Sequence, residues 1–187
     1  MSDIGHNNGP TMEPGESWRR HCWGTARKRL LPTLPIEVVR LRVKRAAEIG
    51  LDYRTYASIR AASGHDVIAL LFSTNALRML PPAPTLPQDR AERLAAVSAT
   101  GRAALVRAPL HPDTVLTLSG GRLDQATPAP RPFASWSETR TALRAALAPQ
   151  NWPADRVVLI GDTHEEREWS QAARLAYYLP ADRFFAA

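Results

Sequence analysis

A short apolar run that stops at a glycine and an acid constrains the fold of this chain more than any other feature. Val157–Ile160 run into Gly161-Asp162-Thr163, and His164-Glu165-Glu166 follow directly. Four consecutive apolar residues bounded in this way are typical of a short strand. Acids placed directly after such a turn are typical of the first turn of a helix. The segment therefore predicts a strand followed by a helix, which is the alternation found in α/β proteins.

The other segments predict mostly helices. We predict helices from apolar periodicity, capping residues, glycines and prolines over 17–32, 35–49, 52–63, 89–100, 135–147 and 164–179. The same signals predict a strand over 103–108, a helix or strand over 111–121, and a loop over 127–132. Residues 67–80 fit either a buried strand over 67–72 followed by a helix, or one helix capped by Asp66. The absence of Gly and Pro across this stretch favours the single helix.

Together these segments predict a mixed α/β fold that is predominantly helical. The first 16 residues are polar and rich in Gly, Asn and Pro, which is typical of a disordered tail rather than of a secretory signal. Residues 17–80 form a basic helical region, and 81–88, with four prolines, predict a stiff connector or a long loop within one domain. Residues 89–187 then predict a small α/β unit.

The positive charge is concentrated near the N-terminus. The chain has a net charge of +6, and 22 of its 24 basic residues are arginine, a bias that a GC-rich genome also produces. Residues 17–70 carry eleven Lys/Arg against four Asp/Glu, whereas 71–187 carry thirteen against eleven. A local excess of this kind indicates an anionic partner, either nucleic acid or an acidic protein.

The strand end at Gly161-Asp162, with a further acid at Glu166, is similar to the last motif of the haloacid-dehalogenase-type phosphatases. In that family, acids at a strand's carboxyl edge hold Mg²⁺ while an upstream aspartate attacks the phosphoryl group. The resemblance implies a D-x-D at the end of an upstream strand and a later lysine. This chain has no D-x-D and no lysine after Lys44, so an arginine would have to serve.

The same acids also fit a purely structural role. Asp162 with Glu165, or Thr163 with Glu166, has the spacing of a capping box, and acids in a first turn favour the positive end of a helix. His164 could join the acids as a metal ligand, but a first-turn histidine is usually solvated. If 67–72 is a strand parallel to 157–161, then Ser73, Thr74 and Asn75 lie near Asp162 and Thr163, at the edge where open α/β sheets bind ligands.

Other signatures of catalysis are missing from the sequence. The five histidines are scattered, Cys22 is the one cysteine, and there is no H-E-x-x-H, no P-loop, no G-x-G-x-x-G and no G-x-S-x-G. The sequence therefore predicts no metal site and no cofactor, with Mg²⁺ as the alternative if the strand edge is catalytic. The catalytic candidates are Asp162, His164, Glu166 and Ser73.

Residues 45–64 loosely resemble a helix-turn-helix. Ala46 and Gly50 have the spacing that allows a close turn, and 53–62 would be the second helix. On this hypothesis the residues that contact phosphates or base edges are Arg54, Thr55, Ser58 and Arg60, and the basic surface continues through Arg19, Arg20, Arg27, Lys28 and Arg29.

The tryptophans allow a third interpretation, that of a pure interaction protein. Trp18, Trp23 and Trp152 are possible anchors for a partner. Trp136 and Trp169 lie on apolar helical faces and are expected in the core. No apolar run approaches the roughly 20 residues of a membrane span, so we expect a soluble, cytoplasmic protein without a membrane partner.

We therefore expect a non-enzymatic binding protein whose basic N-terminal helices contact an anionic partner. The alternative is a metal-dependent enzyme that handles phosphate or nucleotides at Gly161-Asp162-Thr163.

Overall fold

The computed structural model describes residues 34–186. The chain divides into two units between Val39 and Arg40. Helix α2 (Ile36–Glu48) begins before this boundary, and only its part from Arg40 onward is treated below as part of the second unit. Every site considered below belongs to that second unit.

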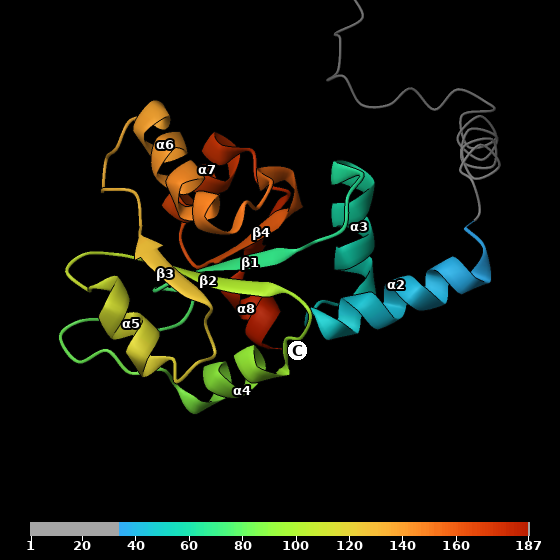
Figure 1. The fold of residues 1–187 in the computed structure, drawn as a ribbon, viewed down its shortest axis with the longest axis horizontal. Helices are drawn as coiled ribbons and strands as arrows, with labels where there is room; N and C mark the ends of the chain where they lie inside the picture. Colours follow the sequence, from blue (N-terminus) through green and yellow to red (C-terminus); the bar gives the residue numbers. More distant parts are fainter. Residues whose placement is uncertain (1–33, 187) are drawn as a thin grey trace, which may run out of the picture. The chain divides into compact units, whose positions relative to one another are not determined.

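Five parallel strands form one sheet in the order β3-β2-β1-β4-β5 (Figure 1). Their bounds are Ala69–Ser73 for β1, Gly101–Val106 for β2, Gln125–Pro128 for β3, Val157–Gly161 for β4 and Tyr177–Pro180 for β5. This is the strand order of doubly wound Rossmann-type sheets, in which the direction of winding reverses between β1 and β4. β1 and β4 pair in register at that point, with Ala69 opposite Val157 and Phe72 opposite Ile160.

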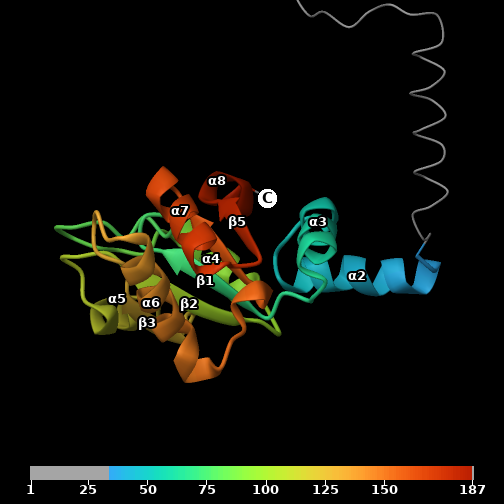
Figure 2. The same ribbon diagram turned by 90° about the horizontal axis from the view of Figure 1, so that it is seen from above.

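Helices cover both faces of the sheet (Figure 2). One face carries α4 (Gln88–Ala96), α5 (Pro112–Leu118) and α8 (Ala181–Phe185), and the other carries α6 (Trp136–Leu147) and α7 (His164–Ala173). Leu70 and Phe72 of β1 enter the first core, whereas Ala69 and Leu71 enter the second, because successive strand residues point to opposite faces. The predicted mixed α/β, helix-rich class is confirmed.

The remaining elements lie at the ends of the sheet. Helix α3 (Tyr53–Ser63) begins at the predicted cap Asp52 and ends at Gly64, whose φ is 75°. Two short 3-10 helices, η1 (Ala148–Gln150) and η2 (Ala154–Arg156), connect α6 to β4. Among the described residues, the structure contains no helix of sufficient length and apolarity to span a bilayer.

Three sequence predictions about local structure were wrong. Residues 67–80 do not form one helix, because 69–73 are strand β1 and a turn follows. A strand that is covered on both faces is apolar on both faces, so it lacks the alternation of polar and apolar residues that marks other strands. Its sequence therefore cannot be told from that of a buried helix. The predicted helix over 164–179 ends at Ala173, and 177–180 form β5. The first two residues of the predicted loop over 127–132 belong to strand β3, which ends at Pro128.

The proline-rich stretch 81–88 connects two parts of one sheet. It follows β1 and leads into α4, while β2 to β5 all lie beyond it in the chain. β1 nevertheless lies between β2 and β4. The predicted tail over 1–16 and the predicted helix over 17–32 lie outside the described residues.

Asp66 ties α2 and α3 to the start of β1. Its carboxylate accepts hydrogen bonds from the Tyr56 hydroxyl at 2.7 Å, from Arg45 Nε at 3.1 Å and from the backbone N–H of Val67 at 2.9 Å. Arg60 Nη1 lies 3.8 Å from the same carboxylate. Burial, followed by the hydrogen bond to Asp66, raises the pKa of Tyr56. One acid therefore contacts two arginines and a tyrosine and holds both helices against the amino end of the sheet.

We predict that Asp66→Ala lowers the free energy of unfolding by about 2 kcal/mol, because a buried hydroxyl and a guanidinium lose their shared acceptor. Urea unfolding followed by circular dichroism measures the change. Asp155→Ala is the matched control, since Asp155 is an exposed acid whose contact with His65 is 3.5 Å long, and we expect a change below about 0.5 kcal/mol. Equal losses in the two variants would contradict the role given to Asp66.

Candidate functional site

The carboxyl ends of β1 and β4 meet, as expected if both are parallel strands. Ser73-Thr74-Asn75 follow β1, and Asp162-Thr163 follow β4. The Asn75 side-chain amide donates a hydrogen bond to Glu166 Oε1 at 2.9 Å, which joins the two strand ends directly. The sequence prediction that these two segments are neighbours is confirmed.

Glu166 is fully buried at this junction, and both of its carboxylate oxygens are engaged. Oε1 accepts from Asn75, and Oε2 accepts from the backbone N–H groups of Asp162 at 2.6 Å and Thr163 at 3.1 Å. Carboxylates buried in proteins need such partners, because an unpaired charge there is costly. The side chain therefore acts as a structural link between the two strand ends.

Of the two capping boxes proposed for this segment, the structure contains the one formed by Thr163 and Glu166. Thr163 Oγ1 accepts from the backbone N–H of Glu166 at 3.3 Å, and the Glu166 side chain accepts from Thr163 N–H. Asp162 stays exposed in front of the helix. The His164 side chain is 84% exposed and lies 3.5 Å from Glu168 rather than with Asp162.

Gly161 makes this arrangement possible. A Cβ atom at this position would lie 2.7 Å from Cε2 of Tyr178 and 2.9 Å from Glu166 Oε2. The Tyr178 hydroxyl donates to the Thr163 carbonyl at 3.2 Å. Burial, together with the nearby charge of Glu166, raises the pKa of Tyr178. A glycine is therefore needed for the strand end, the buried acid and the tyrosine to approach so closely.

The side chains at this edge offer few carboxylate ligands for a magnesium ion. Where the resemblance to the phosphatases implies a D-x-D, β1 ends in Ser73-Thr74-Asn75, which supplies a hydroxyl and an amide in place of two carboxylates. Ser73 is fully buried, and its Oγ accepts from the backbone N–H of Ala76 at 3.0 Å. Among the described residues, no three or more His, Cys, Asp or Glu side chains are grouped so as to hold a metal ion.

Arg107, which the sequence analysis missed, reaches the same edge from the end of β2. Its backbone N–H donates to Thr74 Oγ1 at 3.2 Å, and its Nη1 lies 2.8 Å from Glu165 Oε2. The guanidinium also lies over the ring of Trp169, 5.3 Å from its centre. The position of Arg107 directly after the apolar strand 103–106 was the available signal, because the carboxyl ends of parallel strands share one edge.

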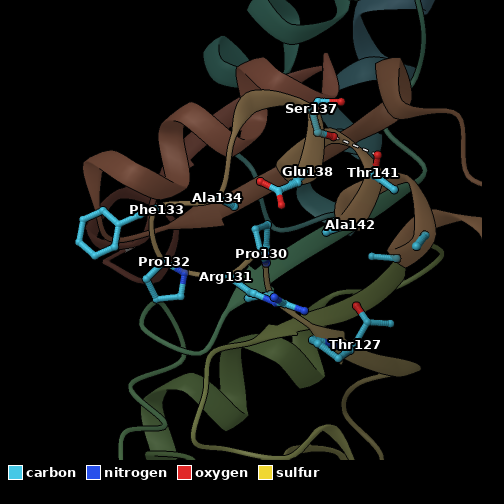
Figure 3. Close-up of a pocket in the computed structure, with 14 residues that line it drawn as sticks. Thr127, Pro130, Arg131, Pro132, Phe133, Ala134, Ser137, Glu138, Thr141 and Ala142 are labelled. Carbon is cyan, nitrogen blue, oxygen red and sulfur yellow. Dashed lines mark hydrogen bonds between the residues drawn. The ribbon is translucent and has the colours of Figure 1, made fainter.

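Two hollows flank the segment that follows β3. The larger, which we call the α6 hollow, measures about 750 Å³ and lies between this segment and α6 (Figure 3). It is lined mainly by alanines and prolines. The smaller, which we call the edge hollow, measures about 420 Å³ and is lined by residues from the ends of β2 and β3 and from α6 and α7, including Arg107, Arg131, Phe133, Trp136, His164 and Glu168.

Two aromatic side chains stand out at the edge hollow. Phe133 lines both hollows, is fully exposed and has a φ of 59°. In Figure 3, which draws the α6 hollow, its ring projects away from the other residues that line that hollow. Trp136 is 50% exposed, so the expectation that it packs in the core was wrong, whereas Trp169 is buried as expected. The predicted capping box at the start of α6 is present: the Ser135 side chain accepts from the Glu138 backbone N–H, and the Glu138 side chain accepts from the Ser135 backbone N–H.

The residues predicted to contact nucleic acid divide into three groups. Arg54 and Ser58 are exposed on α3, while Thr55 is buried and its Oγ1 accepts from Arg183 Nη2 at 3.1 Å. Arg60 is half-buried beside Asp66. The rest of the predicted basic surface lies outside the described residues: Arg19, Arg20, Arg27, Lys28 and Arg29.

Comparisons with models of known protein families, with curated proteins and with solved structures find no match for this chain.

We predict a graded loss of stability at the strand junction. Glu166→Ala should lower the free energy of unfolding by about 3–5 kcal/mol, because it leaves an amide and two backbone N–H groups unpaired inside the protein. Thr163→Ala should cost about 1 kcal/mol as the loss of an N-cap. Asp162→Ala should change stability by less than about 0.5 kcal/mol, since its side chain is exposed. Urea unfolding measures all three, and equal losses for Glu166→Ala and Asp162→Ala would contradict the assignment.

Proposed function

We propose that this chain is a non-enzymatic binding protein that contacts an anionic partner through α2 and α3. The observation that carries the proposal is the arrangement of these two helices. They lie crosswise at one end of the molecule (Figures 1 and 2) and are joined through Gly50, whose φ is 70°. Two short helices joined by a tight glycine turn are the framework of helix-turn-helix motifs.

The faces of α3 are suited to such a role. Tyr56 and Ile59 are buried on its inner side, while Arg54 and Ser58 are exposed on its outer side. Lys44 of α2 is exposed as well. A guanidinium, an ammonium and a hydroxyl are the groups that proteins most often direct at phosphate oxygens.

Ion pairs occupy some of the basic side chains of α2 and α3 and leave others available to a partner. Arg45 pairs with Asp66 and Glu48, and Arg60 lies beside Asp66. Arg42, Lys44 and Arg54 form no ion pair with an acid in the described part of the chain, so their charge can act on a partner. The sequence carries five more basic residues between 17 and 33, which lie outside the described part.

The proposal predicts salt-dependent binding of nucleic acid. Fluorescence anisotropy with duplex DNA and with single-stranded RNA should show affinity that falls steeply between about 50 and 200 mM salt, because binding releases counterions. The double variant Lys44→Ala/Arg54→Ala should weaken binding and reduce the salt slope by roughly one for each lost phosphate contact.

The matched control is Arg144→Ala/Arg174→Ala, which removes two exposed arginines from α6 and from the end of α7. We expect this control to bind as the parent does. Equal weakening in both double variants would show that only net charge matters. Absence of binding at low salt would exclude nucleic acid and leave an acidic protein as the partner.

A second candidate function is phosphoryl chemistry at Gly161-Asp162-Thr163, favoured by the meeting of Ser73, Asn75 and Asp162 at one sheet edge. Glu166 is saturated by structural contacts, which weakens this alternative. It predicts magnesium-dependent turnover of p-nitrophenyl phosphate that Asp162→Ala abolishes without altering the urea midpoint. Asp162→Asn, which keeps the side-chain size, should be equally inactive. Absence of turnover in the parent chain would exclude this candidate for that class of substrate.

A further inference from the structure

We propose that the edge hollow binds a nucleoside phosphate, with the base against Phe133 and Trp136. This site lies at the carboxyl edge of the sheet, whereas α2 and α3 lie at its amino edge, so the proposal does not depend on the function proposed above. Its argument rests on the position of the hollow, on two exposed aromatic rings and on the polar groups around them.

The hollow lies at the carboxyl edge of the sheet, outside which open α/β sheets bind their ligands. Its lining comes from Arg107 directly after β2, from residues 131–134 in the segment that follows β3, and from α6 and α7. A volume of about 420 Å³ is within the range of small-molecule sites. The hollow therefore has the place and the size for one nucleotide.

Phe133 is held in an unfavourable state. Its ring is fully exposed to water, and its backbone has a left-handed φ of 59° that bulky residues rarely adopt. The neighbouring Pro130 and Pro132 restrict the backbone on the approach to this position. Strain of this kind persists where the surrounding structure enforces it, and such positions cluster at functional sites. The segment thus presents a rigid aromatic ring beside the hollow.

Trp136 gives the hollow a second exposed ring. It is the first residue of α6 and is 50% exposed, while the ring of Trp169 lies buried deeper in the same lining. Exposed aromatic rings next to a polar cavity provide stacking surfaces for a nucleobase, because every base has a flat π-face.

The polar groups of the lining suit the rest of a nucleotide. Arg107 is already paired with Glu165 at 2.8 Å and lies 3.9 Å from Glu166, whereas Arg131 is exposed, forms no ion pair within residues 34–186, and acts only at longer range on the exposed Glu138. Arg131 is therefore the cation available to a phosphate. Glu168 is 55% exposed at its side chain, and a carboxylate at this edge can accept hydrogen bonds from sugar hydroxyls.

The test is isothermal titration of the full chain with AMP, adenosine and inorganic phosphate, repeated with GMP, CMP and UMP. We expect saturable binding of at least one nucleoside monophosphate below about 1 mM. Phe133→Ala and Trp136→Ala should each weaken that binding roughly 5- to 150-fold, which corresponds to the loss of one stacking contact. Arg131→Ala should weaken the nucleotide but leave the matching nucleoside unchanged.

Leu118→Ala is the control, because Leu118 is an exposed apolar residue on α5 that lines neither hollow. It should bind as the parent does. Phe133→Ala should keep or raise the melting temperature, which separates a loss of binding from a loss of folding. No binding of any monophosphate up to about 1 mM would overturn the proposal. Binding that survives both aromatic substitutions would overturn it too.

Discussion

The structure depends on one buried carboxylate. Glu166 joins the ends of the two central strands, where it accepts hydrogen bonds from an amide and two backbone N–H groups and lies 3.9 Å from Arg107 Nη1. The same side chain closes the capping box that starts α7. A single acid thus determines where β4 stops, where the next helix begins and how β1 approaches both.

This carboxylate also explains why an acid-rich strand end need not be a catalytic one. In the enzyme class that the segment resembles, such acids bind a metal ion. Here the buried acid, Glu166, instead accepts hydrogen bonds from the backbone and from Asn75. Asp162, the acid that remains exposed, has no second carboxylate opposite it on β1, where Ser73 and Asn75 stand.

Much of the fold followed from the sequence where a local signal was strong. Asp52 and Gly64 delimit α3, Ser135 and Glu138 start α6, and Val157–Gly161 form a strand, all as predicted. Two of the failures share one cause. β1 is apolar from Ala69 to Phe72 and is covered on both faces, and only three residues separate β5 from the end of α7, so neither strand showed a period of its own.

The candidate site was only partly predictable for a related reason. The meeting of Ser73–Asn75 with Asp162 could be deduced once both strands were assumed parallel. Arg107 could have been found in the same way, because it directly follows an apolar strand. Phe133 carried no sequence signal, since its importance comes from its exposure and its backbone conformation, which are properties of the folded chain.

The order of the strands has a consequence for how the protein is made. The centre of the sheet pairs Ala69 with Val157, so the innermost contact joins segments synthesised far apart in time. Until β4 leaves the ribosome, one edge of β1 has no partner, and an unpaired apolar strand edge is prone to wrong association. The chain therefore passes through a stage in which one edge of its central strand is unpaired, and a chaperone would have most to protect at that stage.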